Sequence, residues 1–410
     1  MHHPENRQLV PAVCDVSVTN TCNAACDFCS YSRDKGMVRD HRWLDAEKFA
    51  EALSILYRRG IRYINFQGGE PLLHPAIDRL VADACAAGMR PAVITNGWWL
   101  PKKIENLVAQ GLGTLLVSID SHSMPVHECN RGLEGLGERI RSGIALARRH
   151  HIPVLASVTV NRLVDYDKLP ALLAELGFDA VTFSYPRREP FGSTSLVYST
   201  DSSLVAFGKD ELIGELDKIK AMTKRFPVMN PIAGITDIQR HLRGEEEKFA
   251  CVGGHKYFYL DWNLAIWRCE AWAAPLGSVF EFDRIPNQRD RCTACMMSCY
   301  RDTSVLMHAG IALSDAAAAI GSGGSARRQH RSLGTAWRSH CSRSLSRLAK
   351  FDIWQVFRAR DRKAKSSVLD VGRLGCHRVH SAGHNNQSMG RRRRMSMRRR
   401  RNQLVLGSVS

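Results

Sequence analysis

The chain has 410 residues, 13 cysteines and a formal net charge of +18. It lacks both an apolar run of about 18 residues and an amino-terminal secretion signal, so we expect a cytoplasmic protein without a membrane span. In that reducing compartment, clustered cysteines are expected to bind metal rather than form disulfides. Residues 311–410 hold 22 of the 58 Lys and Arg but 4 of the 40 Asp and Glu, so the first 310 residues are balanced in charge and a nucleic-acid partner is not expected.

Short β-branched runs alternate with amphipathic segments between residues 12 and 215. This alternation predicts an α/β fold with a parallel sheet, and six such units make a partial (β/α)6 TIM-like barrel. The predicted strands are Ala12–Thr19, Tyr63–Gln67, Pro91–Thr95, Leu115–Ile119, Pro153–Thr159 and Ala180–Ser184. The predicted helices are Ala46–Arg59, Pro75–Ala87, Lys102–Gln110, Leu133–Arg149, Asp167–Leu176 and Lys209–Arg225.

A cysteine triplet with C-x3-C-x2-C spacing follows the first strand. Its members are Cys22, Cys26 and Cys29. Iron–sulfur cubanes are normally held by four cysteine thiolates, so three thiolates leave one iron open to a substrate or cofactor. The alternatives are a structural zinc site, which usually needs a second cysteine pair, or cysteines that pack as small apolar residues.

Further motifs follow the triplet in a fixed order, each at the carboxyl end of a predicted strand. They are Gly68-Gly69-Glu70, Thr95-Asn96-Gly97, Val117 to Asp120 and Val158 to Asn161. Loops at this end of a parallel barrel carry the chemistry. With Phe28 just before the last cysteine of the triplet, residues 12 to 215 closely resemble the radical S-adenosylmethionine (radical SAM) enzymes.

The resemblance implies a [4Fe–4S] cluster on Cys22, Cys26 and Cys29, with S-adenosylmethionine bound to the open iron through its amino and carboxylate groups. In such enzymes the cluster cleaves S-adenosylmethionine reductively to a 5′-deoxyadenosyl radical, and the protein supplies binding, orientation and exclusion of water. An electron donor such as flavodoxin or ferredoxin is then expected as a partner.

The same resemblance suggests which residues bind the cofactor. The backbone of Gly68 and Gly69, with Glu70, is expected to receive the methionyl amino group, although a simple strand-end turn would use the same residues. Ser118 and Asp120 are expected to contact the ribose hydroxyls or the methionyl part. For these two the alternative is a helix cap or a turn.

Three more residues complete the predicted cofactor site. Asn161 is expected in a role like that of Asp120, and Asn96 serves either the cofactor or a turn with Gly97. Phe28 is expected to lie over the adenine, with core packing as the alternative. No catalytic side chain is assigned, although Cys129 is a candidate hydrogen donor; a lone cysteine more often packs as a small apolar residue.

A second group of cysteines lies between residues 251 and 299. An aromatic β-hairpin with its turn at Asp261-Trp262-Asn263 would bring Cys251 and Cys269 together. The C-x2-C-x3-C run that follows would then supply further thiolates beside them. The segment resembles the SPASM or twitch extensions that hold auxiliary [4Fe–4S] clusters, although a complete two-cluster SPASM set would need about seven cysteines. The predicted ligands are Cys251, Cys269, Cys292 and Cys295, with Cys299 as a substitute. The alternative is a zinc ribbon.

The predicted domains are a radical SAM core at 12–225, a small cysteine-rich hairpin and helix extension at 226–305, and a basic tail at 306–410. The tail is rich in Arg, Ser and Gly, and its composition favours disorder. Either it is a basic arm for nucleic acid or anionic lipid, or it results from a shifted reading frame in a GC-rich gene.

Taken together, the motifs predict a radical SAM enzyme that modifies an unactivated C–H position. The substrate is a small metabolite, a lipid or cofactor precursor, or a peptide. About 12 residues precede the first strand, which leaves no room for an amino-terminal peptide-recognition domain and lowers the expectation of a peptide. The alternatives are a nucleic-acid-modifying enzyme that uses the tail, and a non-catalytic iron–sulfur electron-transfer protein.

Overall fold

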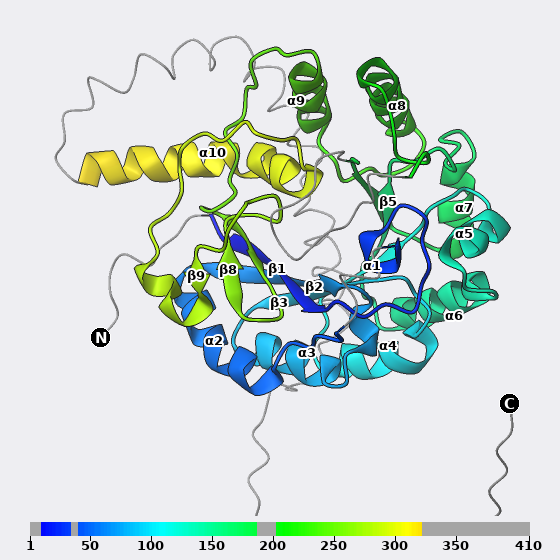
Figure 1. Cartoon of the computed structure of the whole chain (residues 1–410), viewed down its shortest axis with the longest axis horizontal. Coiled ribbons are helices and arrows are strands. Elements are labelled where there is room, and N and C mark those ends of the chain that lie inside the picture. The colour runs from blue at the N-terminus through cyan, green and yellow to red at the C-terminus, as the bar shows by residue number, and fades with distance from the viewer. Residues whose placement is uncertain (1–9, 34–39, 187–201, 322–410) are drawn as a thin grey trace, which may run out of the picture. The chain divides into compact units, whose positions relative to one another are not determined.

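The computed structural model describes residues 10–33, 40–186 and 202–321 (Figure 1). All of them belong to the first of the two units into which the chain divides, residues 1–356. Most of the predicted basic tail, including its arginine runs, lies outside the described residues.

Six parallel strands form the body of one sheet, in the order β6-β5-β4-β3-β2-β1. The alternating strand and helix pattern therefore gave the correct fold class. The strands are β1 (Ala12–Thr19), β2 (Ile61–Gly68), β3 (Arg90–Thr95), β4 (Thr114–Ser118), β5 (Val154–Thr159) and β6 (Ala180–Ser184). Their bounds differ from the predicted ones by two residues at most.

Helices connect these strands and cover one face of the sheet (Figure 1). The longer ones are α2 (Ala46–Arg58), α3 (Ile77–Ala86), α4 (Leu100–Ala109), α6 (Leu136–Arg149), α7 (Leu169–Leu176) and α8 (Lys209–Met222). Shorter ones are α1 (Ser30–Arg33), η2 (Pro71–Leu73) and α5 (Met124–Arg131).

Helix α2 illustrates why these segments are helical. The Asp45 side chain caps it by accepting hydrogen bonds from the backbone N–H groups of Glu47 and Lys48, at 3.0 and 3.1 Å. Its buried residues, Phe49, Ala52, Leu53 and Leu56, recur at the spacing of one helical face. That face packs on the sheet, where the Phe49 and Phe66 rings meet edge to face at 5.8 Å.

The strand register separates an apolar face from a polar one. One row of paired residues runs across five neighbouring strands and is fully buried beneath the helices: Val16, Phe66, Val93, Leu115 and Val154. Because side chains alternate along a strand, the residues between these point to the other face, which we call the lumen. The core of the barrel therefore lies between the sheet and its helices.

The sheet continues beyond β1 into the cysteine-rich segment. Strand β7 (Tyr257–Leu260) pairs in parallel with β1, and β8 (Ala265–Trp267) and β9 (Gly277–Ser278) follow antiparallel to give nine strands. The sheet is open, with β6 and β9 at its edges. The predicted extension is thus continuous with the barrel sheet, which no local pattern could indicate because the paired residues lie about 240 positions apart.

The predicted hairpin turn lies between β7 and β8. Asp261 Oδ1 accepts hydrogen bonds from the backbone N–H groups of Asn263 and Ala265, at 2.9 and 3.0 Å. Its other oxygen accepts from Trp267 Nε1 at 3.0 Å. One buried carboxylate therefore closes the turn and fixes the aromatic ring that follows it.

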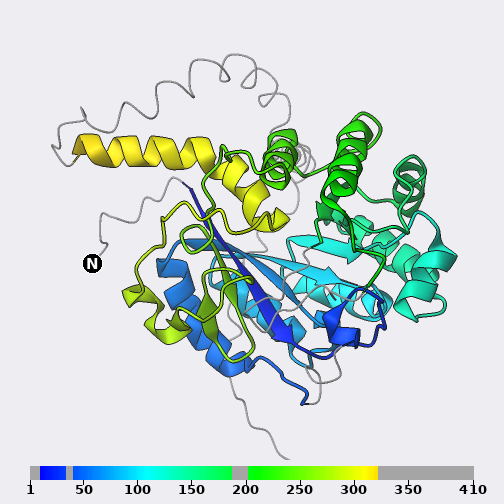
Figure 2. The same ribbon diagram turned by 45° about the horizontal axis from the view of Figure 1, so that its top comes forward.

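Two further helices and a 3-10 segment complete the described chain: α9 (Ile232–Leu242), η3 (Val279–Arg284) and α10 (Ser298–Gly321). Helices α9 and α10 contact each other (Figure 2). Helix α10 continues past residue 306, where the basic tail was predicted to begin, because the run of Ala, Leu and Ile between 305 and 320 favours helix. Every helix in the described part of the chain is too short or too polar to cross a membrane.

Close packing between α4 and α6 gives a test of the fold. A Cβ atom added to Gly143 on α6 would lie 2.4 Å from Leu100 Cβ on α4, whereas a Cβ atom on Gly214 of α8 would meet nothing within 4 Å. We expect Gly143→Ala to lower the unfolding free energy by about 1–3 kcal/mol through overpacking. Gly214→Ala should instead raise it by up to about 1 kcal/mol, because alanine favours helix.

Thermal unfolding of both variants followed by circular dichroism checks this prediction. Equal midpoints for the two variants would contradict the packing of α4 against α6.

Candidate functional site

The cysteine triplet lies in the loop after β1. Cys26 is buried, and Cys22 and Cys29 are partly buried. The loop is held by short-range bonds: the Ala24 N–H points to Cys22 Sγ at 3.4 Å, and the Cys29 N–H donates to the Cys26 carbonyl at 3.2 Å. The Ser32 hydroxyl donates to the Cys29 carbonyl at 2.8 Å. The backbone thus holds three thiols in one compact turn.

The surroundings of the thiols strongly disfavour free thiolates. Burial raises the pKa of the Cys22 thiol to about 12, and the Glu70 carboxylate adds to the effect. Burial also raises the pKa of Cys26 to about 11, although Arg131 opposes it. The pKa of Cys29 is raised further, by burial and then by Cys26 and Cys22. Deprotonation of all three therefore requires a cationic group among them, as metal binding supplies.

Three soft sulfur donors within electrostatic range of one another fit an iron–sulfur cluster. Among residues 10–33, 40–186 and 202–321, no group of three or more His, Cys, Asp or Glu side chains is arranged as a metal-ion site. The expectation of a cluster therefore rests on the cysteine spacing and on the proximity of the three thiols.

Gly68 and Gly69 bring the end of β2 against this cysteine loop. The Gly69 N–H donates to the Thr19 carbonyl and the Glu70 N–H to the Thr21 carbonyl, both at 2.8 Å. A Cβ atom on Gly69 would lie 2.2 Å from the Thr21 oxygen, and Gly68 has a φ of +130°. The two glycines are thus required by the packing of one strand end on the loop.

The Glu70 side chain is fully buried and ties β2 to β3. Its Oε1 accepts hydrogen bonds from the Leu72 N–H at 3.0 Å and from the Thr95 hydroxyl at 2.6 Å. Its Oε2 accepts from the Asn96 N–H at 2.7 Å. Burial raises the pKa of this carboxyl, and these three bonds oppose the rise. The carboxylate therefore fixes the two strand ends around the loop.

Asn96 forms the turn that was one of its two predicted roles. Its Oδ1 accepts from the Trp98 N–H at 2.9 Å, as in an Asx turn. Its Nδ2 donates to Asn23 Oδ1 at 2.9 Å, and Asn23 directly follows Cys22. Asn96 thereby connects the end of β3 to the cysteine loop.

Asp120 is buried in contact with Arg131, a cation that the sequence motifs did not indicate. The guanidinium binds the carboxylate in bidentate fashion, with Nε–Oδ2 at 2.8 Å and Nη2–Oδ1 at 2.7 Å. Burial alone would raise the pKa of the Asp120 carboxyl, but Arg131 and His127 hold it well below its usual range. Asn130 also donates to Oδ2, at 2.9 Å.

Arg131 also lies within electrostatic range of Cys26 and Cys22, which with Asp120 raise its pKa. It stands at the carboxyl end of α5. The sequence held one signal for Arg131. A buried carboxylate at the end of an apolar strand needs a cation nearby, and Arg131 is the basic residue just before the glycine that ends the next helix.

The remaining predicted cofactor residues differ in how their polar atoms are used. Asn161 is fully engaged, because its Nδ2 donates to the Asp120 and Thr159 carbonyls at 3.0 and 2.7 Å and its Oδ1 accepts from the Leu163 N–H at 2.7 Å. Ser118 is partly exposed at the end of β4. Phe28 is buried beside the triplet. The candidate hydrogen donor Cys129 is exposed on α5.

The second cysteine group is brought together around the β7–β8 hairpin. Cys251 lies within electrostatic range of Cys295 and Cys292, and Cys269 within range of Cys295 and Cys251. Burial raises the pKa of the Cys269 thiol to about 12. Each of these four predicted thiols therefore lies within electrostatic range of at least one of the others.

Cys299 has different neighbours. It lies on α10, and burial followed by Glu270 and Asp15 raises its pKa well above the usual value. No other cysteine is among its strongest electrostatic neighbours. Cys299 nevertheless packs against the same small apolar cluster as Cys251, Cys269 and Cys295, so it remains the candidate substitute ligand.

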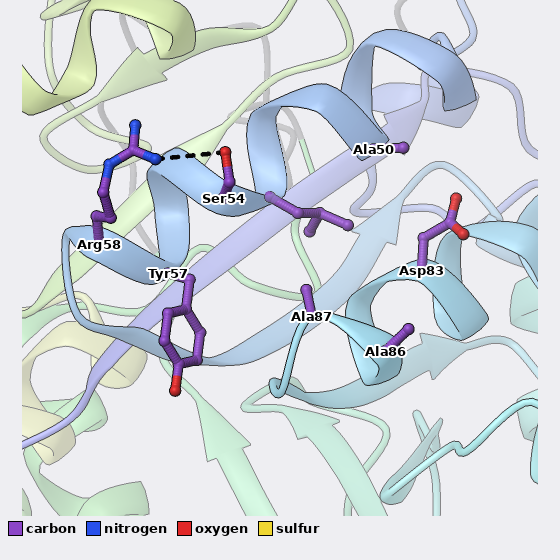
Figure 3. Close-up of a pocket in the computed structure, with 8 residues that line it drawn as sticks. Ala50, Ser54, Tyr57, Arg58, Asp83, Ala86 and Ala87 are labelled. Carbon is purple, nitrogen blue, oxygen red and sulfur yellow. Dashed lines mark hydrogen bonds between the residues drawn. The ribbon is translucent and has the colours of Figure 1, made fainter. Parts of the chain in front are cut away.

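Two surface hollows lie elsewhere. The larger, of about 530 Å³, is a groove between α2 and α3 on the outer helical layer (Figure 3). The smaller has about 330 Å³ and lies beside α8. The larger is lined by Ala50, Leu53, Ser54, Tyr57, Arg58, Asp83, Ala86 and Ala87. Neither contains a predicted cysteine ligand or cofactor residue.

Comparison with known proteins bears on the first cysteine site. Curated relatives include the GTP 3′,8-cyclase of Helicobacter pylori (strain HPAG1), which is 29% identical over 159 residues, or 37% of this chain and 49% of the relative. The AdoMet-dependent heme synthase of Methanosarcina barkeri is 30% identical over 164 residues, or 39% of this chain and 46% of the relative. The chain spans about half the length of the curated relatives it matches.

Among solved structures, Streptococcus suis SuiB bound to S-adenosylmethionine superposes with a TM-score of 0.49 and 15% identity, over 63% of this chain and 60% of SuiB. The sequence model of the Radical SAM superfamily matches residues 16–176, which run from β1 to the end of α7 and contain the cysteine triplet, the glycine pair, Asp120 and Asn161. Residues 16–176 of this chain therefore form a domain of the radical SAM superfamily.

Proposed function

We propose that the chain is a radical SAM enzyme that holds a [4Fe–4S] cluster on Cys22, Cys26 and Cys29 and binds S-adenosylmethionine beside it. The observation that carries the proposal is that three buried or partly buried thiols, the end of β2 with its two glycines, and the Arg131 cation meet at one loop. Bound there, the cluster and S-adenosylmethionine supply a 5′-deoxyadenosyl radical, which modifies an unactivated C–H position of the substrate.

The chain's own residues prepare this site electrostatically. Arg131 supplies a fixed positive charge beside Cys22 and Cys26, which favours their thiolate forms. Asp120 holds the guanidinium in place through two hydrogen bonds, and Asn161 in turn binds the Asp120 carbonyl. Asp120 and Asn161 follow the carboxyl ends of β4 and β5, and Ser118 at the end of β4 is proposed to contact the cofactor.

We further propose an auxiliary [4Fe–4S] cluster on Cys251, Cys269, Cys292 and Cys295. Their mutual electrostatic interaction supports this set, with Cys299 as the substitute ligand. Four cysteines complete the ligand shell of a cubane. Because β7 pairs directly with β1, both cysteine sites are connected through one strand of the sheet.

The proposed substrate is a small molecule. The two curated relatives are named for GTP and for heme synthesis, and these names favour small substrates over a peptide. An electron donor of the flavodoxin or ferredoxin type is proposed as a partner. The alternatives of nucleic-acid modification and of electron transfer alone gain no support from the described residues.

Removal of Cys26 tests both parts of the proposal. The wild-type chain, reconstituted without oxygen, should hold about eight iron atoms and should form 5′-deoxyadenosine from S-adenosylmethionine under reduction. Cys26→Ala should keep about four iron atoms and lose 5′-deoxyadenosine formation. Iron analysis and chromatography of the nucleoside check this.

The matched control is Cys85→Ala, which removes a cysteine of α3 that belongs to neither group and should change nothing. An intact wild-type cluster that forms no 5′-deoxyadenosine would exclude the enzymatic function.

The Asp120–Arg131 pair should be strongly coupled. Arg131→Met leaves a buried carboxylate without its cation, which should lower the unfolding free energy by about 3–5 kcal/mol. The double variant Asp120→Asn, Arg131→Met removes the charge as well and should recover most of this loss. Urea unfolding of the wild type, both single variants and the double variant gives the coupling energy; additive effects would refute a buried ion pair.

Gly69→Ala should separate β2 from the cysteine loop. The new methyl group would meet the Thr21 carbonyl at 2.2 Å, so the loop must move. We expect iron at the first site to fall by half or more while the second site stays filled. Gly214→Ala is the control, since its methyl group meets no neighbour within 4 Å. Full iron content in Gly69→Ala would show that the loop tolerates the shift.

A further inference from the structure

The face of the sheet turned away from the helices carries polar side chains among apolar ones such as Leu116 and Leu155. Strand register places Asp15 on β1 beside Asn65 on β2, and Asn65 beside Ala92 on β3. These positions alternate with the buried apolar row beneath the helices, so they face the lumen. The lumen lies on the side of the sheet where a substrate can reach the carboxyl ends of the strands.

One wall of the lumen is lined with hydroxyl groups. Ser157 on β5 pairs with Thr182 on β6, and one step further along the strands Thr159 pairs with Ser184. All four side chains are partly exposed. Within the described part of the chain, none of the four hydroxyls makes a hydrogen bond to the protein. Four unused hydroxyls in two adjacent rows form a surface suited to a polyhydroxylated ligand.

The opposite wall presents hydrogen-bond acceptors. Asn65 Nδ2 donates to Asp15 Oδ1 at 2.7 Å, and Gln67 Nε2 donates to Glu270 Oε1 at 2.6 Å. Because each amide turns its N–H group toward a carboxyl, its carbonyl oxygen remains available to the lumen. Both amides are partly exposed. This wall therefore favours ligands that donate hydrogen bonds.

A carboxylate beneath this wall lacks a compensating cation. Asp15 accepts hydrogen bonds from Asn65 and from Tyr257, the latter at 2.9 and 3.0 Å, but forms no ion pair within the described ranges. Burial raises the pKa of the Asp15 carboxyl, and the hydrogen bonds from Asn65 and Tyr257 oppose this rise. Ser17, two residues further along β1, also has a buried Oγ that makes no hydrogen bond within the described residues.

Positive side chains are absent from the lumen positions of the other strands. None of the described lumen residues on β1, β2, β4, β5, β6 and β7 is Lys or Arg. Arg90 faces this side only at the amino end of β3, where it is exposed. At these described strand positions an anionic ligand would therefore find acceptors and a carboxylate but no cation.

From this lining we propose that the lumen binds a small substrate that carries a protonated amine together with hydroxyl groups, as amino sugars and amino alcohols do. The amine lies at the Asn65 and Gln67 wall, where the field of Asp15 attracts it, and the hydroxyl groups lie against β5 and β6. The inference rests on the proposed function, because that function places the reactive radical at the open end of this lumen.

Three sugars that differ in charge test the proposal: glucosamine, glucose and glucose 6-phosphate. Their dissociation constants are measured by equilibrium dialysis against the full reconstituted chain with S-adenosylmethionine at pH 7. We expect glucosamine to bind about tenfold more tightly than glucose, as one charge-assisted interaction provides, and glucose 6-phosphate to bind most weakly.

Single substitutions test which residues cause the preference for glucosamine over glucose. Asp15→Asn should bring the glucosamine-to-glucose ratio close to one. Thr182→Val should weaken both sugars by a similar factor and keep the ratio, because it removes a hydroxyl without changing charge. Asp283→Asn is the matched control: it removes a carboxylate that binds Arg58 on the outer surface and should leave the ratio unchanged.

The proposal is overturned if glucose 6-phosphate binds as tightly as glucosamine, if none of the three binds at 20 mM, or if Asp15→Asn keeps the preference. These outcomes are independent of the proposed function, which is read from 5′-deoxyadenosine formation without any sugar. Sugar selectivity without that nucleoside would overturn the function alone, and the nucleoside without selectivity would overturn only this inference.

Discussion

The structure depends on β1, which is hydrogen-bonded on both sides. Its register with β2 runs from Ala12 to Thr19, and its register with β7 from Val13 to Val16. A strand held from two sides cannot slip by one residue without turning its apolar side chains into the lumen. The loop at its end carries the cysteine triplet, so the position of the first site follows directly from this pairing.

Strand β1 also connects the two cysteine sites, and one of its faces forms part of the lumen. Asp15 on β1 binds Tyr257 on β7, and Tyr257 stacks against Tyr300 at the start of α10, with ring centroids 4.4 Å apart. Cys299 directly precedes that tyrosine, is partly buried, and lies within electrostatic range of Glu270 and Asp15. The extension is therefore part of the barrel wall, and any substrate in the lumen lies against residues of both predicted domains.

Two buried carboxylates, those of Asp120 and Asp15, are stabilised in different ways. Asp120 is neutralised by Arg131 through two hydrogen bonds, which leaves a cation beside the thiols of the triplet. Asp15 has hydrogen-bond donors but no ion pair within the described residues. Uncompensated carboxylates are costly to bury unless a ligand or a proton offsets them. Asp120 is thus neutralised within the protein, whereas Asp15 underlies the proposed preference for a positively charged substrate.

Local sequence was sufficient for the six barrel strands, their helices, the triplet and the β7–β8 turn, because each depends on periodicity or on contacts within a few residues. The pairing of β7 with β1, the Arg131 partner of Asp120 and the continuation of α10 past residue 306 were not predicted. The first two join residues that are distant in sequence or lie on different elements. Glu70, Asn96 and Asn161 matched cofactor motifs by type, yet only tertiary structure showed that their polar atoms bind neighbouring strand ends. Sequence thus determined which chemical groups the chain carries, and the fold decided which of them remain free to meet a ligand, because hydrogen-bond partners are assigned only when the strands come together.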